Sequence, residues 1–253
     1  MRRRWIAAAA MAAILGGYAA APHAQETPGA EAKADARTPR WPDGHPNLGS
    51  TPTQKGYWEL RPGGLAGGGT RPADIPFQPW AKGVFDYRRA HQLDSPLVAC
   101  KPGGGPSFFN APGFEIVEVP EMKRIFILNI AGPHSWRVVY MDGRPHPKDL
   151  RPTFLGHSVG HWEGDTLVID SVGFNEKSWV AGSYPTTTAL HLVERLTRPT
   201  LRTLTYEATI DDPGAYTKPW TQRWSITSKT SSSWIDGGEI FEYICEDDRG
   251  GER

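Results

Sequence analysis

The sequence predicts an all-β domain, mainly antiparallel, closed into a single lipocalin-like barrel of about eight or nine strands. From Gly113 onward, nine short stretches alternate apolar and polar residues or are rich in valine, isoleucine and aromatic residues. Short turns connect these stretches, which favours antiparallel neighbours, and only one helical pattern precedes them. A meander this long must curl shut or fold over itself to hide its edge strands, so a two-sheet sandwich is the alternative.

The N-terminus has the pattern of a secretory signal peptide, predicted over residues 1–24. Three arginines precede an alanine-rich apolar run from Trp5 to Ala21, and small residues follow it. The run is too short and too weakly apolar for a membrane span. We place cleavage between Ala20 and Gln25 and expect a periplasmic or secreted protein with no later membrane span.

Residues 25–76 are predicted to form an extended or disordered leader, because Pro, Gly, Ala and charged residues occur there without periodicity. The stretches WPDGHPNLGS and KGYWEL are candidate points of attachment to the domain. A helix is predicted over Pro79–His91. Pro79 suits its first turn, and apolar or aromatic residues recur at helical spacing, namely Trp80, Val84, Tyr87 and His91.

The barrel domain is predicted over residues 77–248, followed by a tail of residues 249–253. Its expected strands are FEIVEVP, KRIFILNI, SWRVVYMDG, LGHSVGHW, TLVIDSVGF, ALHLVERLT, LRTLTYEATI, WTQRWSITS and EIFEYICED. Barrels of this size are wide enough to hold one small ligand.

The composition excludes several functions. Because 28 basic residues balance 28 acidic ones, no excess of positive charge exists to hold a nucleic acid. No G-x-S-x-G, Walker, Rossmann, H-E-x-x-H or C-x-x-C pattern occurs, so neither a cofactor nor a metal is predicted.

Cys100 and Cys245 are predicted to form a disulfide in an oxidising compartment, with a catalytic thiol as the alternative.

The stretch GHSVGHWEGDTLVIDSVGF predicts a hairpin with Gly164 and Asp165 as its two-residue loop. In that register Val159 faces Asp170 and His161 faces Val168. Alternation then places six residues on one side of the ribbon, namely His157, Val159, His161, Val168, Asp170 and Val172. The other side carries small residues and Trp162.

A ribbon face that mixes valines with two histidines and an aspartate resembles a pocket wall. We expect His157 or His161 to act as general base or acid, with Asp170 orienting it. Half-exposed surface histidines are the alternative. A metal site is disfavoured, because the two histidines lie about 13 Å apart on a straight strand and only a bulge at Gly160 would bring them together.

Other polar residues are candidates for the mouth of the pocket. Arg144 and His146 surround the turn after the third predicted strand, where they either shape the turn or contact substrate. Tyr216 and Lys218 lie in the loop DDPGAYTKPW, and with Trp162 they complete the predicted substrate-binding set. Separately, Glu194 stands among leucines and needs a buried partner, for which Arg223 is a candidate in a structural ion pair.

The motifs YMDGRPHP, GHSVGHWEGDTLVIDSVGF, LHLVER, DDPGAYTKPW and EYICE together resemble a group of exported, β-rich, mostly hypothetical bacterial proteins. The resemblance covers Phe77 to Asp247, and the long GHS…GF block is its most specific part. It implies export and one β domain, and it implies no particular reaction.

The predicted function is that of an exported, cofactor-independent enzyme acting on a small, largely apolar organic molecule. The chemistry would be acid–base, as a lyase or isomerase, with hydrolysis less favoured. A non-catalytic, lipocalin-type binding protein is the alternative, and a structural or adhesion module is a third class. The substrate and the oligomeric state are left open.

Overall fold

The computed structural model describes residues 37–52, 55–60, 70–109, 113–130, 135–229, 240 and 245. The predicted signal peptide, residues 25–36 of the leader and the tail lie outside these ranges. So does the last predicted strand, apart from Ile240 and Cys245.

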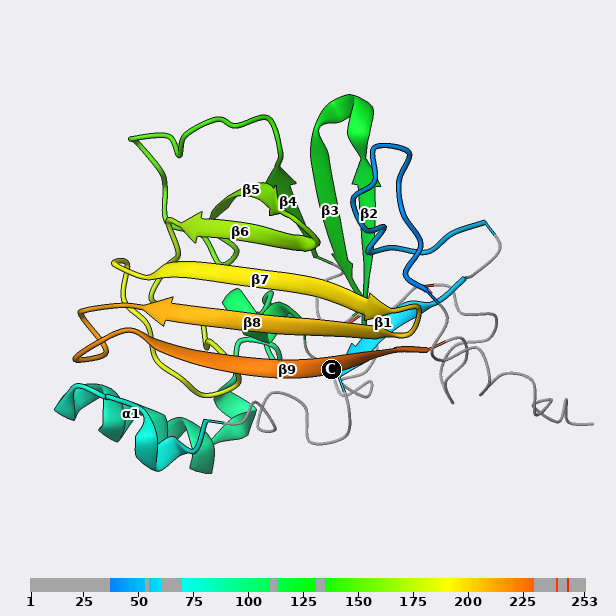
Figure 1. Ribbon diagram of the computed structural model, residues 1–253. Coiled ribbons are helices and arrows are strands. Elements are labelled where there is room, and N and C mark those ends of the chain that lie inside the picture. The colour runs from blue at the N-terminus through cyan, green and yellow to red at the C-terminus, as the bar shows by residue number, and fades with distance from the viewer. Residues whose placement is uncertain are drawn as a thin grey trace, which may run out of the picture.

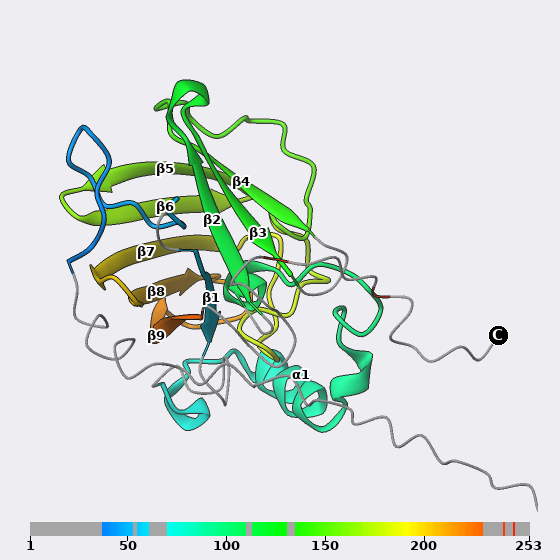
Figure 2. The ribbon, with the colours of Figure 1, turned by 90° about the vertical axis from the view of Figure 1, so that its right-hand side faces the viewer.

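Nine strands in these ranges form one sheet that closes in a ring, as Figures 1 and 2 show. The all-β prediction is therefore confirmed. The strands form one sheet, and not the two sheets of the alternative sandwich. Strands follow one another around the ring in chain order, and β1 pairs with β9. The strands are β1 Tyr57–Leu60, β2 Phe114–Val119, β3 Arg124–Asn129, β4 Trp136–Tyr140, β5 His157–Glu163, β6 Thr166–Val172, β7 His191–Thr200, β8 Thr203–Asp211 and β9 Trp220–Lys229.

Every neighbouring pair is antiparallel except β4 and β5, which are parallel. Antiparallel neighbours need only a tight turn, whereas a parallel pair needs a long crossover. Residues 141–156 form that crossover and arch away from the sheet in Figure 1. This segment carries His146 and therefore matters for the site below.

The leader supplies the strand that completes the ring. β1 consists of the stretch that the sequence marked as an attachment point, and it bridges β2 and β9. The other predicted attachment point, WPDGHPNLGS, also contacts the ring. Leu48 is buried and its carbonyl accepts a hydrogen bond from Trp58 Nε1 of β1 at 2.7 Å. Directly before this stretch, Arg40 pairs with Asp165.

The predicted helix is present as α1, Pro79–Ala90, below the ring in Figures 1 and 2. Its buried face differs from the expected apolar stripe. Ala81 and Phe85 are buried, whereas Trp80 and Tyr87 are about half exposed. Phe85 sits 4.8 Å from Tyr184, ring centroid to centroid. Short 3-10 turns are η3 Pro72–Asp74, η4 Gln92–Asp94, η5 Gly105–Phe109 and η6 Pro120–Met122.

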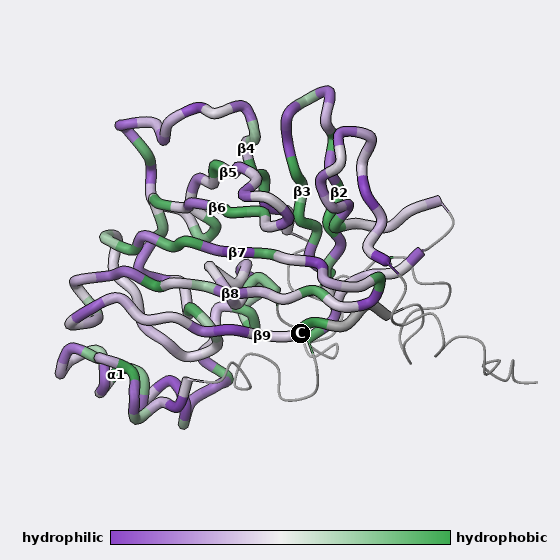
Figure 3. The backbone as a smooth tube through the Cα atoms, in the orientation of Figure 1, coloured by the Kyte–Doolittle hydropathy of each residue, from purple (hydrophilic) through white to green (hydrophobic). Residues whose placement is uncertain are grey.

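Alternating residues fill the inside of the ring, and the alternation of hydropathy along the strands is visible in Figure 3. Phe109 packs against both Phe114 and Tyr206, with ring centroids 4.7 and 4.5 Å apart. The interior near these aromatic residues is therefore packed with side chains.

A polar network is buried in the same interior. Arg137 on β4 forms an ion pair with Glu194 on β7, and the Tyr206 hydroxyl donates to the same carboxylate at 2.7 Å. Glu194 is thus in a structural ion pair, as predicted, but the choice of partner was wrong. Arg223 lies on the outer face of β9 and pairs with Glu207, since its neighbour Trp224 takes the inward position.

Cys100 and Cys245 form a disulfide, which confirms the prediction. Among the described helices, none has the length and apolar character needed to cross a membrane.

Candidate functional site

The β5–β6 hairpin has the predicted register. Glu163 pairs with Thr166, His161 with Val168 and Val159 with Asp170. Gly164 adopts a φ of +59°, a conformation that glycine enters at little cost. The hairpin therefore places His157, His161 and Asp170 on one face, as expected.

That face points outward, so the prediction that it looks into an enclosed hollow is wrong. The inward face carries Ser158, Ile169 and Ser171, which are all fully buried. The two serines are small and leave room for a long side chain from the neighbouring strand β4. Arg137 fills that room and donates to Ser158 Oγ at 3.0 Å and to Ser171 Oγ at 2.7 Å. The hydroxyls satisfy the buried guanidinium, and the histidines are left outside.

Two histidines contact Asp170 on the outer face, and a third contacts one of them. His146 Nε2 lies 3.1 Å from Asp170 Oδ1, and His191 Nε2 lies 3.0 Å from the same oxygen. His146 Nδ1 lies 2.8 Å from His157 Nδ1. We call these four residues the histidine–aspartate cluster. Its side chains are partly shielded, with exposed fractions of 22% for His146, 39% for Asp170 and 42% for His191.

The fold explains how residues far apart in sequence meet. Asp170 lies on the central strand of three, and pairs with Val159 on one side and Val193 on the other. His157 and His191 each stand two residues from those partners, which makes them diagonal neighbours of Asp170. His146 belongs to the crossover between β4 and β5, and its ring contacts Asp170 and His157.

The four residues contact one another in a linear series, from His157 through His146 and Asp170 to His191, and do not surround a common point. The two nitrogens of His146 lie on opposite edges of its ring, so His157 and Asp170 occupy opposite sides of it. Consistent with this, no group of three or more His, Cys, Asp or Glu side chains within the described ranges is arranged to hold a metal ion.

The surroundings favour an uncharged His157. Burial first, and then the nearby His146 and Arg144, lower the pKa of His157 below its ordinary value. Tyr140 stacks on the His157 ring with centroids 5.1 Å apart, and the Arg144 guanidinium lies 4.1 Å from the Tyr140 ring centroid. Hydrogen bonds from Arg144 lower the pKa of Asp142 to about 2, so these two residues shape the turn as well.

His161 is not part of the cluster. Its side chain is 62% exposed and its Nε2 lies 3.1 Å from Glu163 Oε1. Arg195 also donates to Glu163, at 2.8 Å. His161 therefore belongs to a surface charge network on the outer face.

The other predicted pocket residues are also placed elsewhere. The Tyr216 hydroxyl is buried and donates to the Pro185 carbonyl, and burial raises its pKa well above the ordinary value. Lys218 is exposed in the neighbouring loop. Trp162 lies near the end of β5 and packs against the ring of His45 in the leader. The sequence-based site set missed His191, although its place on the strand next to Asp170 was a usable signal.

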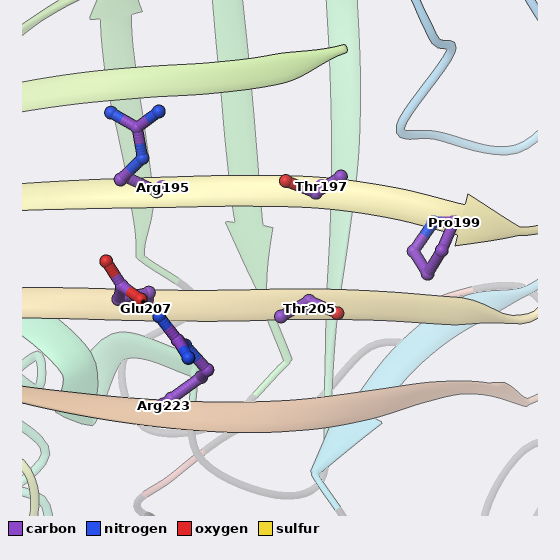
Figure 4. Close-up of a pocket in the computed structure, with 6 residues that line it drawn as sticks. All are labelled: Arg195, Thr197, Pro199, Thr205, Glu207 and Arg223. Carbon is purple, nitrogen blue, oxygen red and sulfur yellow. Dashed lines mark hydrogen bonds and ion pairs between the residues drawn. The ribbon is translucent and has the colours of Figure 1, made fainter.

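Two hollows of about 400 Å³ each lie away from the cluster. One lies on the outer face of β7–β9 and is shown in Figure 4. Its charges are already paired: Arg223 reaches Glu207, and Arg195 points away from Glu207 toward Glu163. The second lies at the end of the ring around Trp162 and is considered below.

Comparison with known proteins identifies no relative: no protein-family description, no curated protein and no solved structure matches the chain.

Proposed function

We propose that the histidine–aspartate cluster is the active site of an exported, cofactor-independent enzyme that moves a proton on a small organic molecule, as a lyase or isomerase. The observation that carries the proposal is the unbroken chain from Asp170 through His146 to His157, with contacts of 3.1 and 2.8 Å. A carboxylate that orients an imidazole is the arrangement that general acid–base catalysis requires.

The hydrogen-bonding capacity of imidazole sets the direction of proton transfer. If His146 Nε2–H donates to Asp170, its Nδ1 must accept, and His157 Nδ1–H is the donor. His157 Nε2 then holds a lone pair for a substrate proton. When that proton arrives, the Nδ1 proton passes to His146, and Asp170 stabilises the positive charge there. The lowered pKa of His157 keeps this base uncharged at neutral pH.

The cluster has a rigid base and a partly apolar rim. Three of its members stand on adjacent strands, which hold catalytic groups more firmly than loops do. His191 contacts the same oxygen of Asp170 as His146 does, at 3.0 Å. Valines on the same face are half-buried around the cluster, which supports a substrate with an apolar part; they are Val159, Val172 and Val193.

Hydrogen exchange at carbon tests the proposal without knowledge of the product. The mature protein is incubated in D₂O with pools of small organic acids, ketones and hydroxy compounds, and the loss of C–H signals is followed by proton NMR. We expect one compound to exchange, with the rate falling about 10²–10⁴-fold in His157→Gln, His146→Gln and Asp170→Asn variants.

His161→Gln is the matched control, since it removes an imidazole from the same face without touching the chain of contacts. It should keep the full exchange rate. Full activity in all three cluster variants would overturn the assignment.

The proposal includes a lipocalin-like barrel shape, which the β1–β9 closure supports. It also includes export, which the disulfide supports. The competing function is a non-catalytic, lipocalin-type binding protein. It predicts a ligand that is released chemically unchanged and no exchange in D₂O.

A further inference from the structure

A cleft of about 400 Å³ lies at the end of the ring where the β2–β3 turn, the start of the crossover and the leader meet. Met141 and Trp162 line it and pack against the hydrophobic core. The His45 ring packs against Trp162 in a tilted arrangement, with ring centroids 4.6 Å apart. The cleft therefore has an apolar, aromatic wall that the core holds in place.

The acidic groups of this cleft already have donors. His45 Nε2 lies 3.0 Å from both carboxylate oxygens of Glu118, and His45 Nδ1 lies 2.5 Å from Asp43 Oδ1. Both ring nitrogens of His45 thus face carboxylates. Arg144 Nε donates to Asp142 at 2.9 Å.

The two basic residues that line the cleft have no such partners. Within the described ranges, no carboxylate pairs with Lys123 or Arg124, and the guanidinium of Arg124 lies over the Tyr140 ring, 5.4 Å from its centroid. The cleft therefore presents two basic side chains without a carboxylate partner in the described part of the chain, beside an aromatic wall.

We propose that this cleft binds a small organic monoanion, with its carboxylate on Lys123 and Arg124 and a flat apolar body against Trp162. Arginine is suited to carboxylates because its planar donors match the two oxygens. The inference is independent of the proposed enzymatic function, because no residue of the histidine–aspartate cluster lines the cleft.

Isothermal titration calorimetry of the mature protein with 2-naphthoate tests the proposal. The same titration with 2-naphthamide, an uncharged probe of similar shape, shows how much of the affinity depends on the carboxylate. We expect the amide to bind at least about tenfold more weakly, because it lacks the charge-assisted bonds. Arg124→Gln should weaken 2-naphthoate about tenfold, and the Lys123→Gln/Arg124→Gln double variant should weaken it further. Trp162→Leu should weaken both probes.

Lys218→Gln is the control, because it removes an exposed positive charge elsewhere and should leave both affinities unchanged. Circular dichroism and thermal midpoints verify that each variant is folded. Equal binding of the acid and the amide, unchanged binding in the double variant, or no binding at a few millimolar 2-naphthoate would each overturn the proposal.

Discussion

Replacing Glu194 by glutamine tests the buried network inside the ring. The change removes one negative charge and keeps the shape of the side chain. In the native protein this carboxylate accepts hydrogen bonds from Arg137 Nη1 at 3.0 Å and the Tyr206 hydroxyl at 2.7 Å, and it also contacts Arg137 Nη2.

The expected cost follows from the burial of both partners. Exposed fractions of 3% for Arg137 and 0% for Glu194 leave no water to solvate an unpaired guanidinium. Removing one partner of such a pair costs about 3–5 kcal/mol, a large part of the stability of an ordinary domain. Urea unfolding followed by tryptophan fluorescence measures this loss in the free energy of unfolding. The dependence of that free energy on urea concentration shows whether the variant exposes the same surface as the wild type when it unfolds.

A double variant separates the pair from its surroundings. Arg137→Met/Glu194→Leu removes both charges, so it should be more stable than either single variant, with a coupling of about 2 kcal/mol or more. The exposed pair of Arg223 and Glu207 is the control, and its loss should cost less than about 1 kcal/mol. A Glu194→Gln protein within about 0.5 kcal/mol of the wild type would refute the reasoning.

Three further predictions concern stability. Replacing Cys100 and Cys245 by serine opens a loop of 145 residues and should cost up to about 5 kcal/mol in urea unfolding; an unchanged midpoint would contradict this. The lowered pKa of His157 means that the unfolded chain binds its proton more tightly, so stability is present above pH 6.5 and lost as the pH falls through the folded value. His157→Asn should therefore lose less free energy of unfolding than the wild type on acidification below pH 6.5. If urea unfolding shows the two free energies falling in parallel with pH, the lowered pKa of His157 is contradicted. Gly160→Ala would bring a methyl group within 2.7 Å of Val139 Cγ1 and should destabilise by about 1–3 kcal/mol; a more stable variant would show that the interior has room.

The sequence by itself determined the local features of this protein. Alternation and short turns predicted eight of the observed strands, β2 to β9, since side-chain period and loop length are local properties. The register of the β5–β6 hairpin followed from its two-residue loop, Gly164 and Asp165. The disulfide followed because only two cysteines exist and the chain carries an export pattern.

Only the tertiary structure decided which face of that hairpin is inside. A strand pattern gives two faces, and the choice depended on Arg137, a residue from another strand that needs the serine side to bury its charge. The same holds for the site. His146 and His191 join His157 and Asp170 through a crossover and a strand pairing that bring distant residues together, and no local periodicity encodes those contacts.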